Sequence, residues 1–283
     1  MTEGMKKRFS VWRVLAGTVL LFAMVAAVAI YWAQPKLAFN PAPKLIADPG
    51  LYDMKFEKVL VETNGISVAG WLVRANGPAC GTVLYCHSSA GNRSYELDAC
   101  LFFTKAGFDV LMFDYPGFAD SRGALSEKHC YESARILFDL LAKQHATRPL
   151  VVYGRARGAA VASKVAKERP VDALVLEAAY SSWSEQAKDQ LGSARHLILW
   201  DFPTEKFLRK VSVPVLFVHS IDDREVPMAE GQRVFDSYQG PKEFFETGGF
   251  HGEAVTVCAP AYRAALLGFM KGIGEQKTNV SAQ

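Results

Sequence analysis

The sequence predicts an α/β protein in which a mostly parallel, doubly wound sheet carries helices on both faces, behind one N-terminal apolar helix. Short, almost continuously apolar segments alternate with segments of helical periodicity, and an uncharged run lies near the N-terminus. Without that run, roughly 240 residues remain, which is enough for one large domain. Half of the residues are hydrophobic and 22% are charged, which excludes a disordered or fibrous protein.

Composition also limits the kinds of partner. A net charge of +3 is too small to predict nucleic-acid binding, and no basic groove is visible. The five cysteines show no CxxC and no zinc-type spacing, and their odd number cannot pair completely within one chain. We expect most of them to be buried, and an extracytoplasmic location would leave room for one disulfide. The sequence predicts no oligomeric state.

Residues 14–35 carry no charge and are long enough to cross a bilayer as a helix, so we expect a single-pass membrane anchor. Aromatic residues stand at both ends of the run, where interfacial rings belong. The basic residues lie mainly before it, which predicts a cytoplasmic N-terminus and an outer, periplasmic or otherwise extracytoplasmic domain; they are Lys6, Lys7, Arg8 and Arg13. A cleaved signal peptide, with residues 27–29 as the small-residue motif, stays an open alternative.

The expected divisions of the chain are a basic segment at 1–13, the anchor at 14–35, a linker at 36–54, the main domain at 55–275 and a disordered tail at 276–283. Four prolines in or beside the linker predict a semi-rigid spacer that lifts the domain off the membrane. Residues 181–210 interrupt the strand and helix alternation, and they include Trp183 and Trp200. We expect this stretch to form a short helical cap over a site.

The domain is expected to open with an antiparallel hairpin at 56–63 and 66–74, because Asn64-Gly65 is a strong turn signal. Further strands are expected at 82–87, 108–114, 149–154, 172–178, 213–219 and 242–247. Helices are expected at 95–106, 127–145, 158–168, 228–238 and 258–272. Ligands of such a fold bind at the carboxyl ends of the strands.

One of these strand ends resembles the nucleophile elbow of serine hydrolases. Gly154-Arg155-Ala156-Arg157-Gly158 follows a predicted strand and opens a predicted helix, which is the context that the elbow requires. Small residues on both sides permit the strained turn, but position 156 carries alanine where the catalytic serine belongs. Taken alone, this glycine spacing is also typical of a strand-to-helix turn without chemistry.

Candidates for the other catalytic groups follow in the chain order nucleophile, acid, histidine. Asp223 is expected to accept the ring N–H of His251, and His251 to take and return the proton of the nucleophile. Asp222 competes for the acid role, but the spacing from His219 and Pro227 favours Asp223.

The oxyanion hole of such a site needs two backbone N–H donors. We expect one from Arg157 and the other from Ser89, or from Ser88 one residue earlier. His87 is expected to brace this loop rather than to transfer protons. Further residues that could line the site are Ser88, Tyr180 and Trp183. The mechanism needs no cofactor and no metal ion.

These motifs resemble those of the alpha/beta-hydrolase domain-containing proteins 13 and 17, serine hydrolases of the BEM46 group. The likeness covers about residues 55–272 and includes the oxyanion segment at 87–92, the segment at 114–123, the acid motif at 219–227 and the histidine motif at 248–251. It implies the α/β-hydrolase fold of the eight-stranded type and cleavage of an ester, thioester or amide bond. Because the group includes depalmitoylating enzymes, it also implies a small-molecule or acylated substrate near the membrane. Ser88 departs from the glycine of the group.

Alanine at position 156 predicts an inactive chain, since a methyl group cannot form an acyl-enzyme and loss of the serine lowers kcat by about six orders of magnitude. We do not expect a substitute among the nearby serines, which are Ser88, Ser89, Ser121 and Ser181. Two hypotheses remain: an inactivating serine-to-alanine variant of a serine hydrolase, or a natural pseudoenzyme with a binding or scaffold role. The retained Asp223 and His251 favour the first.

Overall fold

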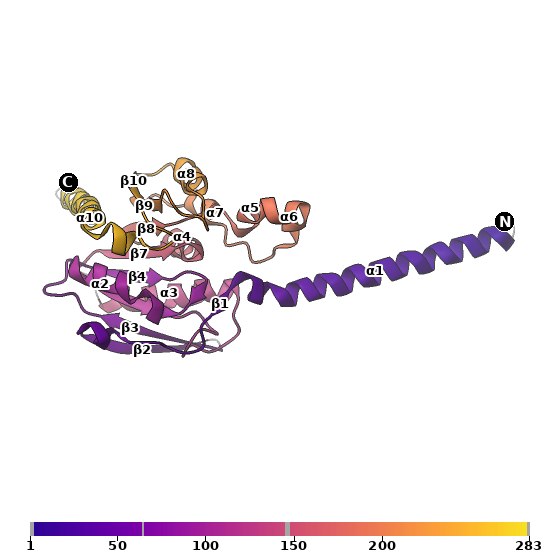
Figure 1. The fold of residues 1–283 in the computed structure, drawn as a ribbon, viewed down its shortest axis with the longest axis horizontal. Helices are drawn as coiled ribbons and strands as arrows, with labels where there is room; N and C mark the ends of the chain where they lie inside the picture. Colours follow the sequence, from indigo (N-terminus) through magenta and orange to yellow (C-terminus); the bar gives the residue numbers. More distant parts are fainter. Residues whose placement is uncertain (1–2, 64, 145–147, 282–283) are drawn as a thin grey trace.

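The computed structural model describes residues 3–63, 65–144 and 148–281, and its centre is a mixed sheet of eight strands in the order β10-β9-β8-β7-β4-β6-β3-β2 (Figure 1). The strands are β2 (Phe56–Thr63), β3 (Ile66–Val73), β4 (Gly81–Cys86), β6 (Phe108–Phe113), β7 (Leu150–Arg155), β8 (Ala173–Glu177), β9 (Val215–Ser220) and β10 (Lys242–Thr247). Strand β3 pairs antiparallel with β2 and β6, and the other pairs are parallel. The predicted sheet and its opening hairpin are confirmed. Asn64 of the predicted turn lies outside the described residues, and Gly65 has φ +79°.

Helices cover both faces of this sheet. One face carries α2 (Leu97–Lys105), α9 (Ala254–Val257) and α10 (Ala259–Ser281), and the other carries α3 (Glu127–Gln144), α4 (Arg157–Glu168), α7 (Thr204–Leu208) and α8 (Met228–Ser237). Each face has its own buried apolar cluster. The inner strands β4, β6 and β9 are buried along their whole length, whereas the edge strand β2 is largely accessible. This double covering explains the continuous hydrophobicity of the inner strands.

Helix α1 (Glu3–Ala38) projects from the domain (Figure 1). Its part from Trp12 to Ala38 is long and apolar enough to cross a membrane, and it is mostly exposed, although Gln34 and Ala38 near its end are buried. Three residues beyond the predicted end of the anchor at 35 therefore belong to the helix. Because an exposed helix of this composition has no apolar partner within the domain, a bilayer would suit it as a solvent.

The predicted spacer is wrong, because its first residues pack on the domain. Phe39 is 4% exposed, and its ring meets those of Tyr115, Phe118 and Phe202 edge to face at centroid distances of 5.5–6.4 Å. Directly after it, β1 (Asn40–Pro41) pairs in parallel with β5 (Ala90–Gly91). The proline-rich composition indicated an extended chain, but burial of one phenylalanine holds that chain against the domain.

The cap is shorter than predicted. It comprises α5 (Trp183–Gln186), α6 (Lys188–Leu191), the 3-10 helix η3 (Gly192–Leu197) and the residues up to Trp200. Phe202 and Leu208 are fully buried in the main core, so the chain has rejoined the domain well before the predicted boundary at 210. Two further 3-10 helices are η1 (Pro49–Tyr52) and η2 (Arg93–Glu96).

At the C-terminus, α10 continues to Ser281, so the tail predicted to be disordered from 276 is helical up to that residue; residues 282–283 lie outside the described part. The five cysteines are free thiols. Cys86, Cys100 and Cys130 are fully buried, in line with the expectation of small core residues.

The packing of Phe39 gives a first test. Phe39→Ala should lower the free energy of unfolding of the domain by about 3–5 kcal/mol, because it leaves a cavity among three aromatic rings. Leu37→Ala, two residues earlier and 69% exposed, is the matched control and should change stability little. Urea unfolding of the full chain in detergent, followed by near-ultraviolet circular dichroism, measures both. Equal effects would show that residues 39–41 do not pack on the domain.

Candidate active site

The turn between β7 and α4 holds Ala156 in a conformation that is unusual for an alanine, with φ 50° and ψ −114°. Its N–H donates to the Glu177 carbonyl at 2.9 Å, which fixes it at the carboxyl end of the sheet. Outside glycine, positive φ costs about 1–3 kcal/mol and is concentrated at functional sites. The central residue of the predicted elbow is therefore strained although it carries no serine.

Close backbone packing produces this strain. A Cβ atom on Gly158 would overlap the carbonyl groups of Cys86 and His87, and one on Gly154 would overlap Gly158 and Ala159. Helix α4 therefore starts in contact with the end of β4, at a separation that only glycine permits. The same contact brings the backbone of Arg157 next to the loop that follows residue 87.

Asp223 and His251 come from the ends of β9 and β10 and meet in a hydrogen bond. His251 Nδ1 lies 2.7 Å from Asp223 Oδ2. The other carboxylate oxygen, Oδ1, accepts the N–H groups of Glu225 and Val226 at 2.9 and 2.8 Å. Asp222 is exposed, and its N–H donates to Ser220. Of the two candidate acids, the geometry therefore pairs Asp223 with the histidine.

Burial would raise the pKa of Asp223, but the hydrogen bond from His251, the N–H of Val226 and the charge of His251 outweigh it, so the pKa lies below its ordinary value. The carboxylate is therefore ionised at neutral pH. It orients the ring with Nδ1–H toward Asp223, which leaves Nε2 as the basic nitrogen.

Two contacts connect this pair to the elbow. Val226, held by Asp223, forms a small apolar cluster with Ala156 and Tyr180. Arg155, the residue before Ala156, donates from Nη1 to the carbonyl of Gly252, the residue after His251, at 3.2 Å. The sequence reasoning missed Arg155 because its partner lies 97 positions away in the chain. Its other nitrogen, Nη2, forms an ion pair with buried Glu96.

The loop after β4 holds the second group of predicted residues. Ser88 and Ser89 are half-buried, and the Ser89 carbonyl accepts the N–H of Asn40 at 2.9 Å. This bond directs the Ser89 carbonyl toward the segment that follows α1. The loop at 87–92 and Asn40, which follows the end of α1, are therefore joined by a hydrogen bond that no local sequence pattern indicated.

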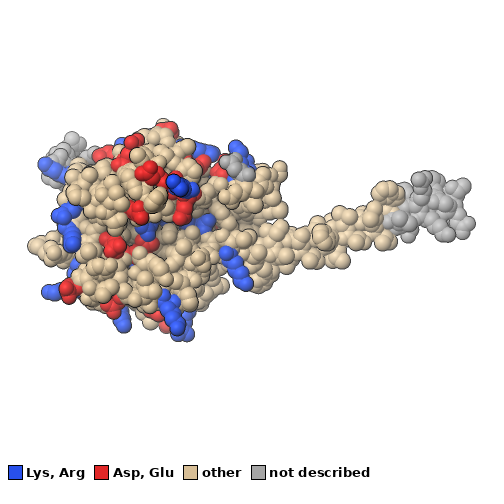
Figure 2. All heavy atoms as spheres, viewed as in Figure 1, with Lys and Arg blue, Asp and Glu red and all other residues tan. Residues whose placement is uncertain are grey.

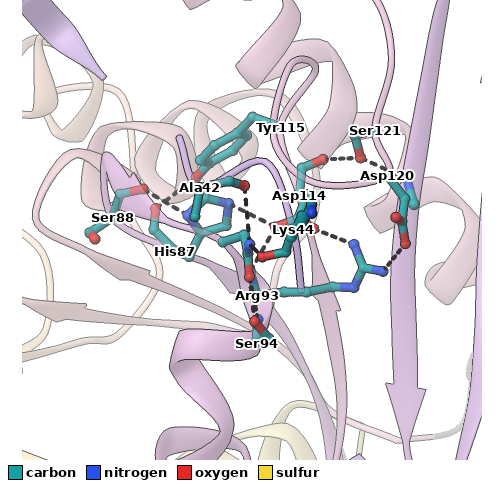
Figure 3. A network of polar contacts seen from close by, with 12 residues as sticks. Ala42, Lys44, His87, Ser88, Arg93, Ser94, Asp114, Tyr115, Asp120 and Ser121 are labelled. Atoms are coloured by element: carbon teal, nitrogen blue, oxygen red, sulfur yellow. Dashed lines mark hydrogen bonds and ion pairs between the residues drawn. The ribbon is translucent and has the colours of Figure 1, made fainter. Parts of the chain in front are cut away.

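His87 lies beneath this loop within a buried polar network (Figure 3). Its Nδ1 is 2.7 Å from the Ser88 carbonyl, and its own carbonyl accepts the hydroxyl of Tyr115 at 3.0 Å. Asp114 accepts the Arg93 N–H at 2.7 Å and forms an ion pair with the Arg93 side chain. Burial lowers the pKa of His87 to about 3, so the ring is neutral and carries its proton on Nδ1. The network supports the predicted bracing role of His87.

Comparison with known proteins agrees with this architecture. Residues 77–207 match the family described as "Serine aminopeptidase, S33". An uncharacterized protein of Mycobacterium tuberculosis is 28% identical over 235 residues, which cover 80% of this chain and 84% of that protein. An esterase of Pyrococcus furiosus has a TM-score of 0.68 at 18% identity, covering 83% of this chain and 97% of that chain. The chain has the α/β-hydrolase fold.

A further relative is the lysophosphatidylserine lipase ABHD12 of Danio rerio, which is 28% identical over 190 residues. The match covers 59% of this chain and half of that lipase. An alpha-beta hydrolase of Vibrio vulnificus also shares the α/β-hydrolase fold, with a TM-score of 0.66, 19% identity and coverage of 77% of this chain and 82% of that chain.

On the cap side of this α/β-hydrolase domain, the side chain of Arg157 fills the space next to the elbow. It is 6% exposed, and its guanidinium lies 4.8 Å from the centroid of the Trp183 ring and 5.4–5.5 Å from those of Phe39 and Phe202. Its Nε has no hydrogen-bond partner among the described residues. Tyr180 is buried beside it, and burial raises the Tyr180 pKa against the opposing charge of Arg157. Tyr180 and Trp183 thus border the elbow, as the sequence suggested.

Two of the neighbouring serines have structural partners. Ser121 donates to the Asp114 carbonyl and accepts the N–H of Ala69, at 2.8 and 2.9 Å. Ser181 donates to Glu230 at 3.3 Å. Neither hydroxyl is bonded to His251 in the described part of the chain. Among the described residues, Asp223 and His251 thus form a hydrogen-bonded pair and Ala156 lies in a strained turn, while none of the neighbouring serine hydroxyls is hydrogen-bonded to His251.

The close packing at the elbow predicts unequal effects of two glycine-to-alanine changes. Gly158→Ala should destabilise the domain by about 3 kcal/mol or more, because the new methyl group meets two backbone carbonyls that belong to the sheet. Gly268→Ala, in open space on α10, should be neutral or stabilise by up to about 1 kcal/mol. Thermal unfolding of both variants gives the comparison. A tolerated Gly158→Ala would contradict the tight elbow.

The neutral His87 predicts an acid-dependent loss of stability. Between its ordinary pKa of 6.5 and about 3, the unfolded chain binds a proton at this residue and the folded chain does not, so stability falls as the pH falls. At pH 4.5 this difference amounts to about 2–3 kcal/mol. Burial raises the pKa of Asp114 to about 6, which contributes with the opposite sign in parent and variant alike.

His87→Gln should therefore flatten the decline in unfolding free energy between about pH 7 and pH 4.5. The control His196→Gln changes an exposed position in the cap and should keep the slope of the parent. Urea titrations across this range measure the slopes. If all three proteins have the same slope, His87 is not held neutral by burial.

Proposed function

We propose that this protein is a membrane-anchored serine hydrolase of the esterase or thioesterase type in a form with serine at position 156, and that the chain with alanine binds acyl substrates without cleaving them. The observation that supports this most directly is the strained Ala156, at φ 50°, next to an intact Asp223–His251 hydrogen bond of 2.7 Å. This costly geometry is the one that a nucleophile elbow needs, and the close packing of Gly158 against the end of β4 maintains it.

In the proposed reaction, the hydroxyl at position 156 attacks the carbonyl carbon of the substrate while His251 Nε2 takes its proton. Asp223 stabilises the imidazolium that forms. The backbone N–H groups of Arg157 and Ser89 donate to the oxyanion of the tetrahedral intermediate. His251 then protonates the leaving group as its bond to the acyl carbon breaks. In the second half, water gives a proton to His251 Nε2 and attacks the acyl carbon, and the bond to the oxygen at position 156 breaks as His251 returns the proton to that oxygen. The reaction needs neither a metal ion nor an organic cofactor.

The substrate class rests on the site and on the relatives. Trp183 is half-buried and packs against the cluster that contains Ala156, and an aromatic side chain at this place suits an acyl chain. Two relatives or fold neighbours are described as a lysophosphatidylserine lipase and an esterase, both of which act on acyl esters. The narrower resemblance to the domain-containing proteins 13 and 17 extends this proposal to lipidated or acylated molecules.

We further propose that α1 is a transmembrane anchor with its N-terminus in the cytoplasm and the α/β-hydrolase domain outside. The basic residues before the span support this orientation. A signal peptide cleaved near residues 27–29 would leave Gln34 and Phe39 in the mature chain, so both alternatives keep the packing of that segment on the domain.

A pseudoenzyme is the second candidate, and alanine at position 156 is the observation in its favour. Such a protein would bind an acyl compound or a partner without turnover. It would have no need for a histidine oriented by a carboxylate, which is why we place it second.

Restoration of serine tests the proposal. Ala156→Ser should create a protein that a fluorophosphonate probe labels and that cleaves short-chain p-nitrophenyl esters and thioesters, with a kcat about six orders of magnitude above that of the parent. The control is the same variant with His251→Ala, which should lose both properties while its circular dichroism stays unchanged. A folded Ala156→Ser protein that is neither labelled nor active would exclude the hydrolase and favour the pseudoenzyme.

A further inference from the structure

The end of helix α1 is attached to the cap by one buried glutamine. Gln34 is 2% exposed; its Oε1 accepts the N–H groups of Leu199 and Trp200 at 2.8 and 3.0 Å, and its Nε2 donates to the Leu197 carbonyl at 3.3 Å. Three hydrogen bonds to consecutive parts of one loop fix the position of that loop along the helix axis. The cap is therefore held at a fixed position relative to the end of α1.

The position of Gln34 along α1 decides how close the cap lies to the hydrocarbon layer of a membrane that α1 would cross. A hydrocarbon layer about 30 Å thick takes about 20 helical residues. Counted from Val14, the first residue after the basic segment, this span ends at about Ala33. Gln34 and the loop bonded to it then lie where the hydrocarbon layer meets the headgroups. Tyr31 and Trp32, both largely exposed, mark the same level with aromatic rings.

The cap presents apolar side chains at this level. Leu191, Leu197 and Leu199 are 46%, 50% and 60% exposed, although each lies on a folded segment. Residues 191–200 contain no acidic residue, and Arg195 is their one fixed charge. Exposed leucines without carboxylates are typical of segments that rest in a lipid interface, where acids are repelled by anionic headgroups.

The figures agree with this placement. In Figure 1, α6 and the loop beneath it project from the domain on the side from which α1 leaves it. In Figure 2, the surface around the exit of α1 is mostly tan, while the acidic residues gather farther along the domain. A pocket of about 880 Å³ lies between the end of α1 and the domain; Tyr31, Trp32 and Trp200 line it together with charged residues of α3 and α4, among them Glu127, Glu132 and Lys164.

The same segment leads from this level to the elbow. Trp200 follows Leu199, and the Asp201 carbonyl accepts the N–H of Trp183 at 2.7 Å. Trp183 packs against the cluster that contains Ala156. Few residues therefore lie between the exposed leucines of the cap and Ala156, and most of those residues are apolar.

We propose that the cap rests on the lipid bilayer, with Leu191, Leu197 and Leu199 in the interface, and that the site takes acyl chains held in that leaflet. The contact with lipid rests on the proposed transmembrane position of α1, and the choice of acyl substrate rests on the proposed hydrolase. Phospholipids and lipidated proteins share the required acyl chain. Gln34 is a positioning residue for this arrangement.

The test uses the full chain in phosphatidylcholine vesicles that contain a lipid with a diazirine on its acyl chain, at a low protein-to-lipid ratio. After irradiation, mass spectrometry maps the labelled residues. We expect labels on α1 and on residues 191–200 of the cap. Leu51 on η1 and Leu60 on β2, which are 69% and 62% exposed and lie outside the cap, are internal controls and should stay unlabelled.

Gln34→Ala should reduce labelling of residues 191–200 at least threefold while α1 stays labelled, and Gln239→Ala, a change at an exposed glutamine of the domain, should have no effect. If the Gln34 variant does not fold, the parent map alone decides. A labelled α1 with a cap labelled no more than Leu51 and Leu60, or a cap crosslinked to a second chain instead of lipid, would overturn the inference. An unlabelled α1 would instead refute the anchor, and neither result depends on hydrolysis.

Discussion

The contact between the start of α4 and the end of β4 is the constraint on which the rest of the site depends. Because Gly158 lies against the carbonyls of Cys86 and His87, the chain can pass from β7 into α4 only through a turn with positive φ at Ala156. That turn raises position 156 above the carboxyl edge of the sheet and brings the N–H of Arg157 beside the 87–89 loop. The strained residue and the approach of Arg157 to that loop are therefore consequences of one close backbone contact.

Networks of polar contacts beneath the site fix the positions of its loops. Arg155 joins buried Glu96 to the carbonyl after His251, and Arg93 joins Asp114 to the loop that begins at His87. Both arginines are largely buried and paired, so removing either partner would leave an uncompensated charge. These networks hold the segment after His251 and the loop after β4 without any contribution from a serine at position 156, so the chain keeps this arrangement with alanine there.

The end of α1 and the segment after it contact both the cap and the candidate site. Gln34 is bonded to the cap, Phe39 packs in the core, and Asn40 donates to Ser89 of the oxyanion loop. The end of α1 and the loop after β4 are thus joined through a few residues. Phe39, Phe202 and Trp183 also surround the guanidinium of Arg157, so residues from the segment after α1, from 183–202 and from the elbow pack together.

The sequence by itself determined the order and type of the elements, the elbow, the departure at Ala156, and the candidates Asp223 and His251, because periodicity and glycine spacing are local properties of the chain. Only the tertiary structure decided the partners of Arg155, Gln34 and Phe39, because each bonds or packs with residues distant in sequence. It also showed that residues 38–42 contact the domain and that the cap ends near Trp200, since proline content and interrupted periodicity describe local conformation and not burial.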